Sequence, residues 1–322
     1  MLSGLKRLRE LGIMGINERN LRLIAKHNPR RLMPLVDDKV QTKELAQEAG
    51  IPTPELYEVI QAQFEVRRVI ERLRERKRFV IKPAEGSQGN GIIVIDDRVK
   101  NGWRKANGQR LSEDDMAFRL SSILSGMYSL AGLPDRAIME YRVELHPLFD
   151  QLAVNGVPDI RIVVFKGVPI MAMLRLPTFA SDGRANLHQG GVGVGVDIVT
   201  GRTVQAMQFN RIITEHPDST LHLTDIQIPY WEDILAVCAK CADMTGLGYL
   251  GVDMVLDKDK GPLLLELNGR PGLSVQIANG WGLRRRVGEV EKATDDLSSI
   301  EARLSYVKSH FKVLEPIAAP PA

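Results

Sequence analysis

The stretch GVDMVLDKDKGPLLLELNGRPGL, residues 251–273, holds the residues best suited to chemistry. It predicts a hairpin that turns over residues 257–261. In a ladder without a bulge, Asp253 lies opposite Glu266 with Cβ atoms about 5 Å apart. Asn268 shares the face of Glu266, because side chains alternate along a strand. Two carboxylates and an amide are oxygen ligands that suit Mg²⁺, whose coordination is completed by phosphate and water. The pattern therefore predicts a magnesium site.

The opposite face of this hairpin is apolar and is expected to be a core, formed by Val252, Met254, Leu256, Leu263, Leu265 and Leu267. The alternative is an ordinary hairpin whose outer face happens to be polar. The turn Asn-Gly-Arg-Pro-Gly at residues 268–272 argues against that alternative, because strand packing does not explain a tight turn there.

A second stretch, FVIKPAEGSQGNGIIVI at residues 79–95, places Lys82 and a glycine-rich loop between two β-branched runs. Gly86 and Gly91 have the spacing of a P-loop, but isoleucines stand where its lysine and hydroxyl residue belong. A dinucleotide fingerprint needs a helix after the glycines, and here a strand follows. We therefore expect a hairpin loop whose backbone N–H groups close over phosphates. The alternative is a mobile hairpin with an incidental lysine.

Composition limits the classes of function. The chain has 322 residues, enough for two lobes, with a net charge of +3 and 5% aromatic residues. This charge is too small to indicate nucleic acid binding, and stacking residues are scarce. No apolar run approaches a membrane span, and the N-terminus lacks the apolar core of a secretory signal. These features predict a cytoplasmic protein of mixed α and β structure.

The elements that must position these motifs have clear signals. Asp38 and Gln41 predict the start of a helix that closes at Gly50. Further helices are expected over 64–77, 112–130 and 231–245, the last burying Cys238 and Cys241 as small apolar residues. Other hairpins are expected at 101–102 and 166–167, and the alternating glycines after residue 190 predict a strand face without side chains. A C-terminal helix over 297–311 is expected to dock on the body, or else on a second copy.

Taken in order, these motifs resemble the ATP-grasp superfamily, most closely the RimK-like α-L-glutamate ligases, from about residue 17 to residue 281. The resemblance implies an α+β (mixed α/β) fold in which two subdomains grip ATP between antiparallel sheets. Only 38 residues precede Lys39, so a reduced helical segment is expected in place of a full preceding domain. The expected parts are 1–36 (N-terminal helical segment), 37–137 (lid subdomain with the glycine-rich loop), 138–285 (large subdomain with the metal-binding hairpin) and 286–322 (C-terminal helix and tail).

The resemblance also implies site residues, through the blocks DDKVQTKELAQEAGIPTP, FVIKPAEGSQGNGIIVI, IMEYRVE, DIRIVV and SDGRANLHQGG. The ATP-binding residues that it implies are Lys39, Lys82, Gly86, Ser87, Gly89, Glu140, Tyr141, Asp159, Arg184, Ala185 and Asn186. It implies that Mg²⁺ or Mn²⁺ is bound by Asp253, Glu266 and Asn268, and that His188 lies near the substrate. The positive groups expected to act on the substrate carboxylate and the transferring phosphoryl group are Arg161, Arg184 and Arg270.

The activity implied is that of an ADP-forming, ATP-dependent carboxylate–amine ligase that works through an acyl phosphate. Glutamate is the default carboxylate, and the amine belongs to a peptide or a small molecule. The nearest glutamate ligases have a small residue where this chain has Arg270, whose guanidinium can bind a carboxylate in a bidentate manner. The alternatives are a kinase of the same fold, with His188 as its base, and a nucleotide-binding regulatory protein without turnover. Association into a homo-oligomer is left open.

Overall fold

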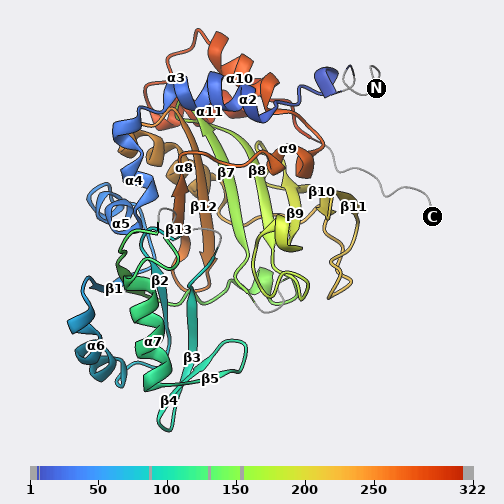
Figure 1. Ribbon diagram of the computed structural model, residues 1–322. Helices are drawn as coiled ribbons and strands as arrows, with labels where there is room; N and C mark the ends of the chain where they lie inside the picture. Colours follow the sequence, from blue (N-terminus) through green and yellow to red (C-terminus); the bar gives the residue numbers. More distant parts are fainter. Residues whose placement is uncertain (1–5, 7, 87–88, 130–131, 153–155, 315–322) are drawn as a thin grey trace.

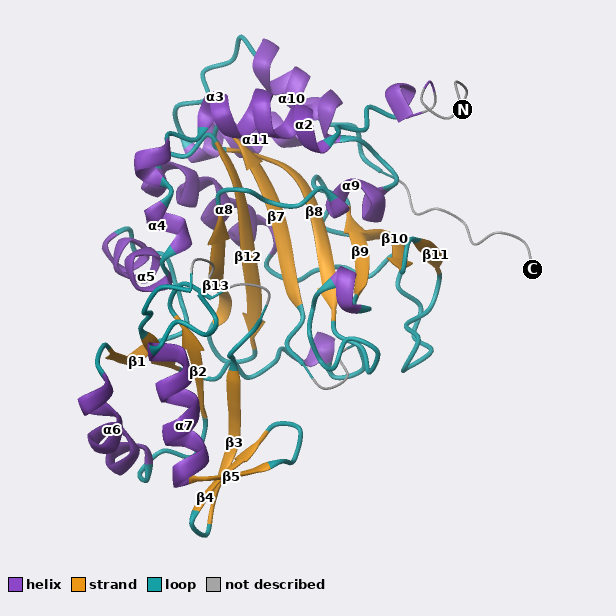
Figure 2. Ribbon diagram, in the orientation of Figure 1, coloured by secondary structure: helices purple, strands orange, loops and turns teal. Residues whose placement is uncertain are grey.

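The computed structural model describes residues 6, 8–86, 89–129, 132–152 and 156–314 (Figure 1). Its strands form one sheet of six strands and one of seven (Figure 2). Every pairing between neighbouring strands is antiparallel. Helices pack on both sheets, which is the mixed α and β architecture predicted. No described helix is long and apolar enough to cross a membrane.

The six-stranded sheet carries the glycine-rich loop. Its strands, in spatial order, are β1 (Leu56–Ile60), β6 (Ala137–Glu140), β2 (Phe79–Pro83), β3 (Ile93–Val99), β4 (Gly102–Lys105) and β5 (Arg110–Ser112). The loop joins the antiparallel pair β2 and β3, as predicted. Because β6 belongs to this sheet, the chain leaves it after Glu140, beyond the boundary expected at residue 137.

Two helices, α6 (Val66–Leu73) and α7 (Glu113–Leu124), cover this sheet and bury Phe79 and Trp103 in its core. A third, α5 (Lys39–Glu48), begins where the sequence indicated. The Asp38 carboxylate accepts hydrogen bonds from the Val40 amide at 2.9 Å and from the Gln41 side chain at 2.9 Å. This cap fixes where Lys39 starts the helix, and so where its side chain lies.

The seven-stranded sheet carries the carboxylate hairpin. Its strands, in spatial order, are β11 (Arg211–Ile213), β10 (Thr203–Gln208), β9 (Val192–Val196), β8 (Val168–Leu176), β7 (Asp159–Phe165), β12 (Tyr249–Asp257) and β13 (Gly261–Asn268). Lys166 and Gly167 join β7 to β8 with φ angles of 48° and 79°, so the predicted two-residue hairpin turn is confirmed.

Helices pack against a face of the large sheet and across one end of its strands (Figure 1). They are α8 (Trp231–Thr245), α9 (Ser274–Asn279), α10 (Leu283–Lys292) and α11 (Ile300–His310). Cys238 and Cys241 of α8 are buried and unbridged, as expected. Val307 of α11 and Phe311 beyond it join the same core, so the C-terminal helix docks on the body of the protein. The tail after residue 314 lies outside the described residues.

The N-terminal segment packs on the large sheet. It comprises α2 (Ile16–Glu18), a π-helical stretch (Arg19–Ile24), α3 (Ala25–His27), a 3-10 turn (Arg30–Leu32) and α4 (Pro34–Asp37). Other 3-10 turns lie later in the chain, at Gln63–Glu65, Pro147–Phe149 and Leu187–Gln189. Leu23 is buried in the main core. The Arg19 guanidinium donates to the Pro271 carbonyl at 2.8 Å, which ties this segment to the turn after β13.

Alternating glycines in β9 let other segments approach the sheet. Gly193 and Gly195 pair with Arg175 and Met173 of β8. A Cβ atom added at Gly195 would lie 2.4 Å from the Ala278 carbonyl oxygen of α9, and one at Gly193 would lie 2.6 Å from the Leu187 side chain. The predicted bare strand face is therefore occupied by backbone and side chains from other elements.

We expect Gly195→Ala to lower the free energy of unfolding by about 1–3 kcal/mol, because α9 must move to admit the methyl group. The matched control is Gly288→Ala in α10, where nothing lies within 4 Å of the added atom. That change is expected to be neutral or to stabilise by about 0.5–1 kcal/mol. Urea denaturation of both variants measures the difference, and equal stabilities would contradict the close approach of α9.

Candidate active site

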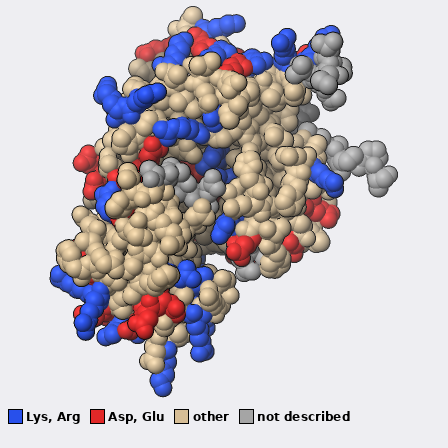
Figure 3. Space-filling view, in the orientation of Figure 1, with Lys and Arg blue, Asp and Glu red and all other residues tan. Residues whose placement is uncertain are grey.

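A single large cleft brings together most of the predicted site residues. It has a volume of about 1850 Å³ and lies between the two sheets. Figure 3 shows the hollow between the lobes, with Lys and Arg side chains at its edge. The predicted residues that line it are Lys39, Gly86, Gly89, Asp159, Arg161, Arg184, Ala185, Asn186, His188, Asp253, Glu266, Asn268 and Arg270. Lys82, Glu140 and Tyr141 are not among its lining residues, and Ser87 lies outside the described residues.

The carboxylate hairpin has the predicted register at its chemical end. Asp253 pairs with Glu266, and Gly251 pairs with Asn268. Beyond Asp253 the register shifts by one, so Met254 pairs with Leu264. The register expected for a ladder without a bulge therefore holds from Gly251 to Asp253, and a bulge separates it from the turn. The extra residue is Leu265, which is half-buried and lines the cleft instead of entering the main core.

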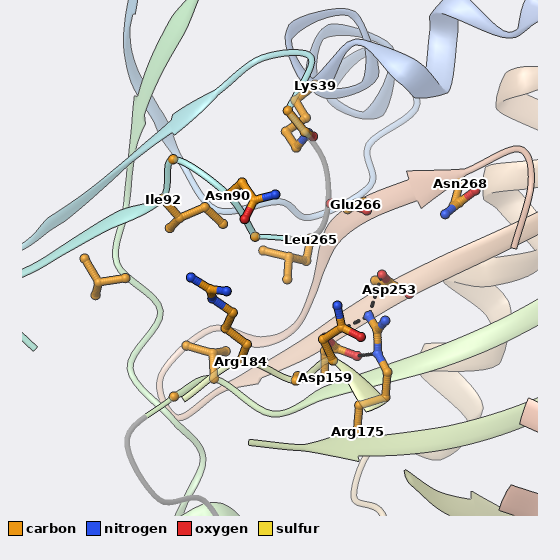
Figure 4. Close-up of a pocket in the computed structure, with 18 of the residues that line it drawn as sticks. Lys39, Asn90, Ile92, Asp159, Arg175, Arg184, Asp253, Leu265, Glu266 and Asn268 are labelled. Carbon is orange, nitrogen blue, oxygen red and sulfur yellow. Dashed lines mark hydrogen bonds and ion pairs between the residues drawn. The ribbon is translucent and has the colours of Figure 1, made fainter. Parts of the chain in front are cut away.

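Asp253 takes part in a buried network of charges that the sequence did not reveal. Arg161 donates to both of its carboxylate oxygens, at 2.5 Å for the Nε contact. Arg175 donates to the Asp253 Oδ2 at 2.7 Å and to both oxygens of Asp159, at 2.5 and 2.8 Å. Figure 4 shows Arg175 between the two carboxylates. All four side chains project from adjacent strands, β12, β7 and β8, so strand pairing alone brings them together.

Burial and charge act in opposite directions on these acids. Burial raises the pKa of the Asp159 carboxyl, although Arg175 opposes the shift. For Asp253, burial is outweighed by the two guanidinium groups, which hold the pKa of this carboxyl below its usual range. A buried carboxylate is stable only when it is paired, so each arginine supports the ionised state of the acid that it contacts.

The lid side has a second buried cluster, centred on Glu140. Its carboxylate forms ion pairs with Lys82 at 2.6 Å and with Lys43 at 2.9 Å. Burial lowers the pKa of Lys43 to about 8, although Glu140 opposes the shift. Lys43 lines the cleft and was missed in the sequence. Its spacing of four residues from Lys39, which puts both on one helix face, was the available signal.

Lys39 contacts the glycine-rich loop directly. Its Nζ donates to the Gly86 carbonyl at 2.7 Å and to the Ala84 carbonyl at 3.4 Å. Gly89 and Gly91 have φ angles of 76° and 77°, a region that favours glycine and explains their presence in this loop. Lys39 and the described residues of the loop therefore line the cleft together on its lid side.

The remaining predicted cations differ in their surroundings. Arg270 forms an ion pair with Asp37 at 3.1 Å. The exposed Arg184 donates to the Gln189 side chain at 3.3 Å, and in Figure 4 it points into the cleft toward Asn90 and Leu265. The Asn186 side chain accepts from the His188 amide at 3.0 Å, so the loop that carries both is held by its own polar groups.

The described residues offer few free oxygen donors for a magnesium ion. They contain no cluster of three or more His, Cys, Asp or Glu side chains placed to hold a metal ion. Both Asp253 oxygens accept from arginines. The Glu266 side chain has no hydrogen bond or ion pair to another described residue, and the Asn268 side-chain oxygen only accepts from the Arg270 amide at 2.7 Å. Glu266 and Asn268 are thus the available oxygen donors, which fits Mg²⁺ because this ion keeps several waters and binds substrate phosphate.

Comparison with known proteins identifies the family. The model of the sugar-transfer associated ATP-grasp family matches residues 18–292. A probable alpha-L-glutamate ligase of Parasynechococcus marenigrum (strain WH8102) is 26% identical over 234 residues, which are 72% of this chain and 34% of the relative. The chain thus spans about a third of the length of that curated relative.

Solved structures were also compared with this chain. The biotin carboxylase domain of the Hydrogenobacter thermophilus 2-oxoglutarate carboxylase has 15% identity and a TM-score of 0.48, covering 84% of this chain and 49% of that one. The D-alanine–D-alanine ligase of Bacillus anthracis has 15% identity and a TM-score of 0.43, covering 85% of this chain and 69% of that one.

The buried network predicts a specific loss of stability. We expect Arg175→Leu to lower the free energy of unfolding by about 3–5 kcal/mol near pH 8, because Asp159 is left buried without a cation. Without Arg175 the pKa of Asp159 rises further in the folded state, so the deficit grows as the pH increases from 5 to 8. Denaturation of Arg175→Leu at both pH values measures this. Arg184→Leu, at an exposed cleft position, serves as control and should change stability by about 0.5 kcal/mol or less. A deficit that does not depend on pH would contradict the ionic origin.

Proposed function

The chain belongs to the sugar-transfer associated ATP-grasp family, and from this premise we propose that it is an ATP-dependent carboxylate–amine ligase. One observation carries the proposal. The cleft places Lys39 and the glycine-rich loop of the lid across from Glu266 and Asn268 of the large sheet. Such a site brings cationic and N–H groups to one side of a triphosphate and metal-binding oxygens to the other.

In this proposal the lid binds the nucleotide phosphates. Positive charge comes from Lys39 and Lys82, and N–H donors come from the backbone of the Gly86–Gly91 loop. Lys82 is paired with Glu140, so its use on a phosphate requires that this ion pair open or that Lys43 alone hold the carboxylate. Glu140 and Tyr141 remain our candidates for the adenine end, and Asp159 for the ribose.

Mg²⁺ is proposed to bind Glu266 and Asn268, with Asp253 beside them. When bound, it neutralises charge on the phosphates and withdraws electrons from the phosphorus that is attacked. The protein positions these oxygens through the β12–β13 pairing, because Asp253 and Glu266 are direct partners there. Arg161 and Arg175 hold Asp253 of β12 in place. Because β12 pairs with β13, this also helps to fix the position of Glu266 on β13.

The arginines of the cleft are proposed to act on the substrate carboxylate. One oxygen of that carboxylate attacks the γ-phosphorus, the bond to the β-phosphate oxygen breaks, and ADP leaves. Arg184 and Arg270 stabilise the negative charge that spreads over the transferring group, together with Arg161. An amine then attacks the activated carbonyl carbon, an amide bond forms, and phosphate departs while the amine loses a proton. Acyl phosphates hydrolyse, so closure of the glycine-rich loop serves to exclude water.

The finer identity of the substrates is also a proposal. Glutamate is our first candidate for the carboxylate, since the curated relative is named a probable alpha-L-glutamate ligase. A peptide or a small metabolite supplies the amine. Phosphorylation of an alcohol is a second candidate, supported by the exposed His188 in the cleft, which is the residue available as a base.

The test measures ADP and phosphate release from Mg²⁺-ATP with pooled amino acids, in the presence of hydroxylamine to trap an acyl phosphate. A hydroxamate that forms with one acid is the expected result, and Glu266→Gln should reduce its rate about 100-fold or more. Glu44→Gln, an exposed position on α5 outside the cleft, serves as control and should retain the full rate.

A second readout does not depend on turnover. Binding of Mn²⁺ together with ADP, followed by electron paramagnetic resonance, should weaken in Glu266→Gln and stay unchanged in Glu44→Gln. ADP release without hydroxamate or free phosphate would favour the kinase. Tight nucleotide binding without turnover in any pool would speak against catalysis and for the regulatory alternative.

A further inference from the structure

Two cations of the lid line the cleft and form no ion pair with any described residue. They are Lys105, the last residue of β4, and Arg119 of α7, and both line the cleft. Lys105 donates from its Nζ to the Gln109 side chain at 3.0 Å, and Arg119 has no side-chain hydrogen bond or ion pair to a described residue. We call these two residues the outer cation pair.

Most other cations that line the cleft are already neutralised. The ion pairs of cleft-lining residues are Lys43–Glu140, Arg142–Asp96, Arg161–Asp253, Arg175–Asp159 and Arg270–Asp37. Lys39 contacts backbone carbonyls, and Arg184 contacts an amide side chain. The proposed function assigns Lys39 and Arg184 to the nucleotide and the transferring group, but it leaves the outer cation pair without a role.

The surroundings of Lys105 favour a bound anion. Burial lowers the pKa of its ammonium group, and the neighbouring Arg119 lowers it further, while Asp182 on the facing loop opposes the shift. Asp182 is exposed and forms no ion pair with Lys105. A half-buried lysine beside an arginine is stabilised when a negative group comes between them.

The outer cation pair lies apart from the proposed phosphate site. In the small sheet β4 is separated from β2 by β3, so Lys105 is about 10 Å across the sheet from the strand of Lys82. The cleft also exceeds what a nucleotide needs, because its volume of about 1850 Å³ compares with roughly 300–1,000 Å³ for ordinary ligand sites. There is room for a second substrate at this end.

Apolar side chains also line the cleft. Met127, Tyr128 and Phe179 line it, and Met127 and Phe179 are 64% and 62% exposed. The Tyr128 ring packs against Gly91, where an added Cβ would lie 2.7 Å from it, so the ring is adjacent to the glycine-rich loop. A ligand that extends beyond the phosphate site therefore meets cations and a partly apolar wall in the same cleft.

We propose that the outer cation pair binds a carboxylate or phosphate group that does not itself react, carried by one of the two substrates. This inference rests on the proposed function and specifies its substrate class. The ligase acts on a molecule that has an anionic group besides the reacting one, with an apolar portion beside it. A substrate whose only charged group is the reacting carboxylate or amine leaves Lys105 and Arg119 unmatched.

The test uses inorganic phosphate and malonate as separate probes, titrated calorimetrically into the full chain saturated with Mg²⁺ and a non-hydrolysable ATP analogue. The wild-type protein should bind at least one probe, and the double variant Lys105→Gln/Arg119→Gln should bind it at least about 10-fold more weakly. The matched control is Lys100→Gln/Arg67→Gln, which removes two exposed charges of the same lobe that do not line the cleft. The preferred probe shows whether the group is a phosphate or a carboxylate.

Equal probe affinity in the three proteins, or no binding of either probe to the wild type, would overturn the inference. A second measurement needs no variant. Amine acylation of the wild type, followed by peptide mass spectrometry, should show that the effective probe protects Lys105 and leaves Lys100 unprotected. If the wild-type protein does not bind the nucleotide, that result counts against the proposed function alone. The same probe titrations without nucleotide still compare the outer cation pair variant with its control variant.

Discussion

The bridge that Arg175 forms between Asp159 and Asp253 is the interaction on which the large-sheet side of the cleft depends. Two carboxylates on neighbouring strands of a buried sheet repel each other, and the guanidinium converts that repulsion into a link across β8, β7 and β12. Arg161 completes the neutralisation of Asp253. Because Asp253 is the direct partner of Glu266, the same link fixes the strand that presents the free carboxylate to the cleft.

The lid uses the same solution with the signs reversed. There one carboxylate, Glu140, is shared by Lys43 and Lys82, so a buried acid keeps two lysines from repelling each other. In each lobe, therefore, the buried charges beside the cleft are largely neutralised by partners from the same lobe. The polar groups left over, which include Lys39, Glu266 and the outer cation pair, are the ones free to meet a ligand. Balanced interiors with unmatched groups at the surface are what a binding cleft requires.

Local patterns in the sequence predicted the local structure well, and pairing between distant side chains was beyond them. The helix cap at Asp38, the turn at Lys166 and the pairing of Asp253 with Glu266 all follow from neighbouring residues. The bulge at Leu265 could not be predicted, because residues 263–265 are all leucine and any one of them could be the extra residue. Arg161 and Asp253 are 92 residues apart, so their contact depends on a strand order that no local signal encodes. Roles such as adenine or metal binding remain predictions.

The π-helical stretch at Arg19–Ile24 has a consequence for how this chain tolerates changes in length. A π-helix accommodates one residue more per turn than the ordinary repeat allows. Removing one residue between positions 20 and 24 would therefore restore a regular helix and leave the residues before it in nearly their present orientation. Removing a residue from a regular helix would instead rotate them by about 100°. After the first change Arg19 would keep its contact with the carbonyl of Pro271, in the turn that follows Asn268. The π turn thus absorbs a change of length in a segment that is tied to the turn after β13, although none of its residues lines the cleft.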